Sequence, residues 1–277
     1  MKKQLDIFFT ALLFYTRIPC PKNIDHNPEY LNKASRYFPL IGWIVGVVCF
    51  GVYYLALTMF TVEIALILSM IAGILTTGAF HEDGFADVCD GFGGGWAKDK
   101  ILAIMKDSAI GAYGAVGLVL LFLLKFQSLV QIIDKVQKCD TGLTMCRGSF
   151  QDGILNYSIL LLFVVAHSVS RLAAISIVFT AKYVSEDALS KSKPVAQRYS
   201  WHEVAGAFFF GLLPLVVLSF FQWQLVLSLV PIIITRFFLV RYFQKWIGGY
   251  TGDCLGATQQ IVEIVFYLSI IGIWKFI

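Results

Sequence analysis

The chain has 277 residues, of which 58% are hydrophobic and only 14% are charged, and its mean hydropathy is +0.74. Soluble domains carry about a quarter charged residues, so this composition excludes a water-soluble globular protein and indicates an integral membrane protein in contact with the lipid bilayer. The formal net charge of +4, without a basic stripe that interleaves aromatic residues, argues against nucleic acid as a partner.

The N-terminal stretch MKKQLDIFFTALLFY predicts a helix that is retained at the membrane interface. It carries Asp6 and lacks the A-x-A cleavage site that is typical of a secretory signal. We therefore assign residues 1–36 to an interfacial N-terminal arm. No fixed-period repeat or Pro- or Ser-rich linker divides the chain, so residues 1–277 are predicted to form a single polytopic membrane domain.

Seven stretches are long and apolar enough to cross a hydrocarbon core of ~30 Å. Inside lipid the backbone must satisfy its own hydrogen bonds, and continuous apolar runs without a period of two indicate helices and not barrel strands. The predicted fold class is an all-α bundle of about seven transmembrane helices. The predicted spans are 37–60, 62–80, 110–132, 154–181, 204–221, 225–243 and 261–277.

Short loops rich in Lys and Arg predict the orientation of the bundle. The N-terminal arm holds six basic residues and is expected in the cytoplasm: Lys2, Lys3, Arg17, Lys22, Lys33 and Arg36. Alternating spans then bring the loops at 81–109, 182–203 and 244–260 to the same side, which predicts a multi-pass protein of the cell inner membrane with a cytoplasmic active site. The outward loop at 133–153 contains Cys139 and Cys146, and a disulfide between them stays open.

Four acids in the stretch HEDGFADVCDGFGGG, residues 81–95, follow the second predicted span directly. If that helix continues past Phe80, the spacing of four and three residues puts Asp83, Asp87 and Asp90 on one face. Like charges so close repel one another, which predicts a hard divalent ion such as Mg²⁺ among them; a solvated turn is the alternative. The glycine-rich residues 91–96 are expected to be a non-helical flap, within an acidic and glycine-rich catalytic loop at 81–109.

Two further loop segments carry charge on the same side. Lys106 and Asp107 lie just before the third span, where a helix N-terminus and a lysine suit an anionic phosphate, although a pair of anchoring charges is the plainer alternative. The segment GGYTGDCLGA at 248–257 contributes one carboxylate, Asp253, and by itself would be a turn.

Ionisable residues within membrane spans are functional candidates. Snorkelling toward the interface accounts for Lys125 and Arg236. Arg171 is far from its helix end and has His167 one turn away, so we expect it to face inward. It would bind a substrate phosphate or pair with a carboxylate such as Glu263.

Taken together, these segments resemble the adenosylcobinamide-GDP ribazoletransferase (cobalamin synthase) family. Its H-x-D-G-x-A-D-x-x-D pattern corresponds to His81 through Asp90, its I-M-K-D-S-x-I-G-x-[FY]-G pattern to Ile104 through Gly114, and its G-G-x-T-G-D-x-x-G-A pattern to 248–257. FYTRIPCP at 14–21 and YFPLIGWIVG at 37–46 resemble its N-terminal segments. Glu82 lies at a variable position of the first pattern that is usually apolar.

This resemblance implies a reaction in which adenosylcobinamide-GDP and α-ribazole, or its 5'-phosphate, give adenosylcobalamin, or its 5'-phosphate, and GMP. It implies Mg²⁺ held by Asp83, Asp87 and Asp90, with Asp90 or Asp107 accepting the proton of the attacking hydroxyl. The candidates for substrate contacts are Lys106, Arg171, Arg17 and Asp253, and His81 is a candidate for proton transfer or orientation.

Two other classes of protein stay open. A cation-coupled transporter would place the acids near the middle of the bilayer, and a non-catalytic scaffold for cobalamin enzymes would not need three carboxylates in register. Glycine-lined helices also permit a homo-oligomer.

Overall fold

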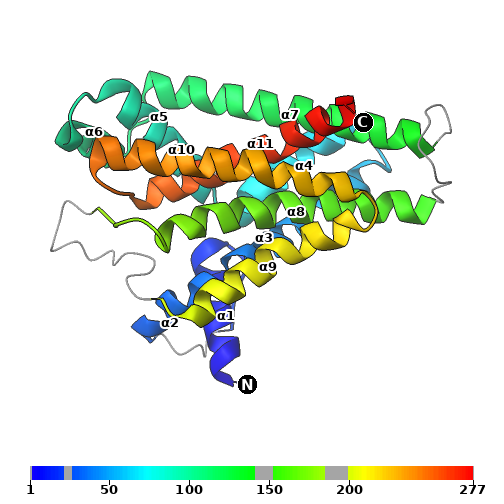
Figure 1. Ribbon diagram of the computed structural model, residues 1–277. Coiled ribbons are helices and arrows are strands. Elements are labelled where there is room, and N and C mark those ends of the chain that lie inside the picture. The colour runs from blue at the N-terminus through cyan, green and yellow to red at the C-terminus, as the bar shows by residue number, and fades with distance from the viewer. Residues whose placement is uncertain (1, 22–26, 141–151, 185–198, 277) are drawn as a thin grey trace.

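The computed structural model describes residues 2–21, 27–140, 152–184 and 199–276, and the regular elements in these ranges are helices. Figure 1 shows the long helices running along one common axis, with α5 and α6 gathered at one end beside the junction of α10 and α11. The long helices are α3 (Phe38–Ala56), α4 (Val62–Thr77), α7 (Ala112–Asp140), α8 (Asp152–Val178), α9 (Trp201–Ser219), α10 (Leu229–Ile247) and α11 (Gly252–Phe276). The shorter ones are α1 (Lys2–Tyr15), α2 (Pro28–Ala34), α5 (Phe80–Gly94), α6 (Lys98–Met105), η1 (Ser35–Tyr37) and η2 (Trp223–Ser228).

The membrane-spanning helices confirm the predicted fold class. In the described ranges six helices are long and apolar enough to cross a membrane, and α4 with α5 make a seventh if this bent pair is one span. The last span was wrongly placed at 261–277, because its helix already begins at Gly252. Polar residues in the first turns of this helix lower its local hydropathy, so the hydropathy pattern did not show where the helix begins.

The closest helix packing in the centre of the bundle joins α3 to α8. Gly42 on α3 lies directly against the backbone of His167 and Ser168, where a β-carbon would collide with the main chain. Small residues let helix backbones approach closely in membranes, where packing replaces the hydrophobic effect between helices. The part of α8 that carries His167 and Ser168 is thereby held against α3.

A proline inside α9 is compensated by a neighbouring helix. Pro214 has no N–H, so the carbonyl of Phe210 one turn earlier loses its partner within the helix. The indole Nε1 of Trp43 on α3 donates to that carbonyl at 2.8 Å. A buried membrane helix can keep a proline because a neighbour satisfies the freed group.

The break between α4 and α5 corrects the prediction that the second span runs on into the acids. Gly78 and Ala79 both have positive φ, 67° and 58°, and their N–H groups close the end of α4 on the carbonyls of Leu75 and Ile74. The chain then turns by 90° into α5. The acids therefore lie on a separate helix that leaves the direction of the span.

The glycine-rich stretch after the acids is also helical where a flap was predicted. Gly91 to Gly94 complete α5, and α6 follows after a short turn. The 81–109 region is thus mostly helical. Gly91 lies against Met105 and Ile101 of α6, so this packing between helices overrides the low helix propensity of glycine.

Three predicted loops do meet at one end of the bundle. The backbone of Tyr250 pairs with the segment after α8: its N–H donates to Lys182 and its carbonyl accepts from Val184, at 3.0 and 2.8 Å. The N-terminal arm reaches the same end, because the N–H of Arg17 donates to the carbonyl of Thr76 at 2.8 Å. The arm does begin with a helix, α1, as predicted. Cys146 lies outside the described residues, so the possible disulfide between Cys139 and Cys146 stays a prediction.

Candidate active site

The candidate site is an acidic patch made of Asp83, Asp87 and Asp253, where α5 meets the first turn of α11. The two α5 acids are one turn apart and share a face, as their spacing predicted. Gly84 between them lies against the backbone of Asp253, where a β-carbon would come within 2.9 Å of the Asp253 Cα atom. The negative charges of Asp253, Asp83 and Asp90 all act on Asp87, with that of Asp253 the strongest.

No cation of the chain neutralises these acids within the described residues. Asp83 is exposed and Asp87 is half-buried, and neither side chain has an ion pair or hydrogen bond in this part of the chain. Asp253 accepts a hydrogen bond of 3.3 Å from the hydroxyl of Thr251. Like charges left open to solvent in this way form a site that favours a cation or a ligand that brings one.

The donor set of the acidic patch fits Mg²⁺ in an open site. Within the described ranges no three His, Cys, Asp or Glu side chains approach closely enough to form a complete metal cage. Mg²⁺ in phosphate chemistry is typically held by one or two carboxylates, with substrate phosphates and water completing its shell. Oxygen donors facing water, next to a backbone brought close by Gly84, match that kind of site.

Asp90, the third acid of the series, has a different environment. Its two carboxylate oxygens accept the N–H groups of Gly111 and Gly114 at 2.7 and 2.9 Å, so it caps the N-terminus of α7. The sequence predicted that Asp90 and a free helix N-terminus lie in this region. It did not predict that the Asp90 carboxylate caps this N-terminus. The metal and base roles predicted for Asp90 stay predictions.

The other surface candidates are Arg17, Lys106 and Asp107. Arg17 is exposed and packs on the turn at Gly78, just before α5. Lys106 caps the C-terminus of α6. Asp107 follows it, is exposed, and uses one oxygen to accept the N–H of Ala109 at 3.1 Å.

Two tyrosines that the sequence did not single out pack beside Asp253. The rings of Tyr183 and Tyr250 meet edge to face, with centroids 5.5 Å apart. Burial and the neighbouring phenol of Tyr183 raise the pKa of Tyr250 to about 12, and burial together with the charge of Asp253 raises the pKa of Tyr183. Both phenols therefore stay protonated at neutral pH and can donate hydrogen bonds.

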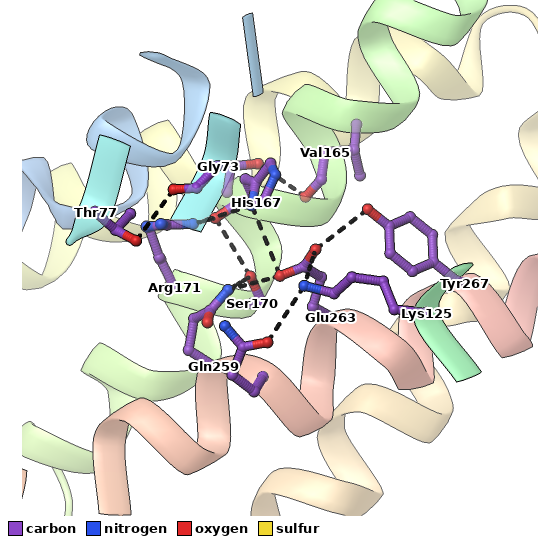
Figure 2. Close-up of polar contacts among 12 residues, drawn as sticks. Gly73, Thr77, Lys125, Val165, His167, Ser170, Arg171, Gln259, Glu263 and Tyr267 are labelled. Atoms are coloured by element: carbon purple, nitrogen blue, oxygen red, sulfur yellow. Dashed lines mark hydrogen bonds and ion pairs between the residues drawn. The ribbon is translucent and has the colours of Figure 1, made fainter. Parts of the chain in front are cut away.

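A second group of charged residues lies in the interior and is called here the buried network: Glu82, Lys125, Arg171, Gln259, Gln260 and Glu263. Figure 2 shows Lys125, Gln259 and Tyr267 converging on the carboxylate of Glu263. The Lys125 Nζ atom is 3.0 Å from Glu263, and Gln259 donates to the same carboxylate at 2.9 Å. Gln260 accepts from Lys125 at 3.2 Å and donates to Glu82 at 2.9 Å.

These contacts correct one prediction and refine another. Lys125 does not snorkel to the interface, because its ammonium group is buried in an ion pair with Glu263. Arg171 faces inward as expected and is only 1% exposed, but its guanidinium donates to the His167 carbonyl at 3.0 Å. Glu263 lies near it and attracts it without a direct ion pair.

His81 also belongs to the interior. Its ring is 2% exposed and stacks on Phe38 with centroids 5.8 Å apart, on the side of α5 away from the acidic patch. Glu82 and the two glutamines were missed as members of this group. The available signal was a helical one: Gln259, Gln260 and Glu263 recur on one face of the last span.

Comparison with known proteins identifies the family. A family model described as cobalamin-5-phosphate synthase matches residues 7–271. A Shewanella amazonensis protein named adenosylcobinamide-GDP ribazoletransferase is 42% identical over 275 residues, 99% of this chain and 98% of that protein. A Shewanella putrefaciens protein of the same name is 43% identical over 270 residues, 97% and 95% of the two chains. No solved structure matches.

The chain belongs to the cobalamin-5-phosphate synthase family. The family assignment and the full-length similarity make it a transferase of cobalamin synthesis, as its sequence motifs predicted. The acidic patch and the Asp90 cap are built by the three motif segments, two of which are neighbours at 81–90 and 104–114 while the third lies far away at 248–257. An open group of carboxylates beside a helix N-terminus and protonated phenols can bind a metal-complexed phosphate.

Proposed function

We propose that the acidic patch binds Mg²⁺ together with the diphosphate of adenosylcobinamide-GDP, and that the transfer to α-ribazole or its 5'-phosphate takes place there. The observation that carries this proposal is the grouping of three carboxylates at the end of the bundle, with no neutralising cation among the described residues, in a chain of this family. The names of the relatives supply the substrate class.

The proposed step is a displacement at phosphorus. The ribose hydroxyl oxygen of the acceptor forms a bond to the corrinoid-linked phosphorus, the bond from that phosphorus to the bridging oxygen breaks, and GMP leaves with that oxygen. Catalysis of such a step consists mainly of positioning and neutralisation of charge. When bound, Mg²⁺ would neutralise phosphate oxygens and favour the departure of GMP.

The residues of this chain have separate roles in the proposed step. Asp83 and Asp87 would hold the metal from α5, and Asp253 would face them from α11. Of the two predicted proton acceptors, Asp107 has the more available carboxylate. It is exposed, and one of its oxygens has no contact among the described residues. Both oxygens of Asp90 instead accept N–H groups. Arg17 and Lys106 are the exposed candidates for the substrate phosphates.

The transporter alternative is disfavoured by the position of Asp253. This residue lies in the first turn of α11, at the end of a 25-residue helix, whereas a transported ion is bound near the middle of the bilayer. The scaffold alternative is set aside because the family consists of transferases.

We also propose that the acidic patch faces the cytoplasm across the cell inner membrane. The support is the concentration of Lys and Arg in the N-terminal arm, which meets the patch end of the bundle through Arg17. A cysteine introduced at exposed Trp96 should react with a membrane-impermeant maleimide only after the cells are permeabilised. Labelling of intact cells would contradict this orientation.

The direct test of the proposed function uses the purified, detergent-solubilised protein with adenosylcobinamide-GDP and α-ribazole 5'-phosphate. We expect GMP release that requires Mg²⁺ and stops when the metal is chelated. Release that is independent of metal would overturn the role of the acidic patch, and the absence of release would overturn the assigned reaction.

A further inference from the structure

A partly enclosed cavity lies beneath α5, on the opposite side of this helix from the acidic patch. Its volume is about 30 Å³, and it is lined by residues of the buried network together with His81. One water molecule needs ~10–15 Å³ by this measure, so the cavity has room for about two.

Four residues that line this cavity each have a buried side-chain atom without a hydrogen-bond partner in the described part of the chain: His81 Nε2, Glu82 Oε2, Arg171 Nε and Gln259 Oε1. Each of the four residues is at most 8% exposed. Buried polar groups are paired with protein or ordered water in nearly all native structures. Four unpaired atoms around one small space therefore indicate that something polar occupies it.

The charges around the cavity select a neutral occupant. Glu82 and Glu263 are balanced by Lys125 and Arg171, all on the cavity wall. Because these charges already cancel, an added cation or anion would leave an unbalanced buried charge, which is costly. The unpaired atoms include the Arg171 N–H donor and two carbonyl or carboxylate acceptors, a mixture that water can satisfy because it both donates and accepts.

We propose that this cavity is a water-binding site whose ordered water joins Glu82 on α5 to Arg171 on α8, and that Glu82 is thereby a positioning residue for the acidic patch. Arg171 is attracted by the charge of Glu82, although no direct hydrogen bond joins them. Bridging water supplies the missing link between the two side chains.

The connection to the acidic patch runs through the helix itself. Glu82 precedes Asp83 in sequence, and its other oxygen is held by Gln260 of α11. About two turns further along the same helix, Asp90 is held by the N-terminus of α7. Two fixed points on α5 set its rotation about its own axis, and this rotation determines where Asp83 and Asp87 point.

The test uses hydrogen exchange of the full-length protein in detergent, with Glu82→Gln as the main variant. This change keeps the shape but places a donor opposite the Arg171 N–H and leaves the cavity with an excess positive charge. We expect amides in residues 80–94 to exchange at least tenfold faster than in the wild type, with α10 unchanged. A double variant, Glu82→Gln with Arg171→Gln, restores the charge balance and should return exchange in 80–94 to within about threefold of the wild type.

The control is Glu203→Gln, which removes another buried carboxylate that pairs with an arginine. Glu203 is 2.6 Å from Arg36 and closes the capping box of α9, away from α5. It should leave exchange in 80–94 unchanged. Unchanged exchange in Glu82→Gln, or faster exchange in the double variant than in the single one, would overturn the proposal.

The water itself is tested by an experimental structure of the wild-type protein that resolves solvent. This test does not depend on whether the variants fold. We expect density bonded to Glu82 Oε2 and Arg171 Nε, and an empty cavity would overturn the water site.

The positioning role, which rests on the proposed function, predicts that Glu82→Gln lowers the kcat of GMP release at least tenfold with KM within twofold. If the wild type releases no GMP, the proposed function fails, while exchange and solvent density still decide the water site.

Discussion

The acidic patch and the buried network are built on the same two helices, α5 and α11, but they treat charge in opposite ways. In the acidic patch Asp83 is exposed and Asp87 and Asp253 are partly buried, and none of the three carboxylates has a basic partner among the described residues. In the buried network two carboxylates and two basic groups balance, and Glu263 alone receives hydrogen bonds from Gln259, Tyr267 and Lys125. Adjacent residues, Glu82 and Asp83, belong to different regions.

The difference shows how to separate functional from structural charge in a membrane bundle. Burying an unpaired charge is expensive, so interior charges are found with partners and support the fold. Charges without a partner persist where water solvates them, and there they are available to a ligand. We expect substitutions in the acidic patch to change activity without a loss of stability. Substitutions in the buried network should change stability, and among them a change of Glu82 should also lower activity, because Glu82 positions α5.

The largest effect is expected for Asp87→Asn in the acidic patch. A metal site contributes several kcal/mol to catalysis and each 1.36 kcal/mol is a factor of ten, so GMP release should fall by at least about 10³-fold. The thermal midpoint should be equal or higher, because the change removes repulsion from Asp83 and Asp253. Retained activity, or a large loss of stability, would break the contrast between the regions.

The next largest effect is expected for Glu263→Gln in the buried network. This variant leaves the buried ammonium of Lys125 without its counter-charge, and breaking such a pair costs about 3–5 kcal/mol. Unfolding titrations in mixed micelles measure the loss. Replacing both partners, in Lys125→Met with Glu263→Leu, should recover most of it. A cost below about 1 kcal/mol for the single variant would show that the pair is not structural.

A third test concerns the contact that brings Asp253 to α5. In Gly84→Ala the added methyl group meets the backbone of Asp253 at 2.9–3.0 Å, and overpacking of this kind costs about 1–3 kcal/mol. Because α5 and α11 must move apart, GMP release should also fall. Gly94→Ala on the same helix is the matched control: its nearest neighbour is 3.5 Å away, so it should be neutral or stabilising by up to about 1 kcal/mol.

The smallest effect is expected for Asp90→Asn, at the edge of the acidic patch. An asparagine keeps one acceptor for the N-terminus of α7, so the unfolding free energy should fall by about 1 kcal/mol. GMP release should fall less than tenfold. A loss as large as that of Asp87→Asn would instead make Asp90 a metal ligand or the base, as the sequence alone predicted.

Several features followed from the sequence because they depend on neighbouring residues. The number of spans follows from the length of the apolar runs, and the shared face of Asp83 and Asp87 follows from helical spacing. The three motifs also indicated the family before any helix was placed. The helix boundaries predicted from hydropathy were wrong at two places. Polar residues begin the last helix at Gly252, and two residues in the αL conformation turn the chain at Gly78.

Tertiary structure alone decided which charges meet. Asp253 joins Asp87 although 166 residues separate them in sequence. Lys125 finds Glu263 instead of the interface, and Asp90 caps a helix that begins 22 residues later. Sequence determines hydropathy and helical period because both are local. The partner of a charge depends on which helix faces pack together, and this is settled only when the whole bundle excludes lipid and water from its interior.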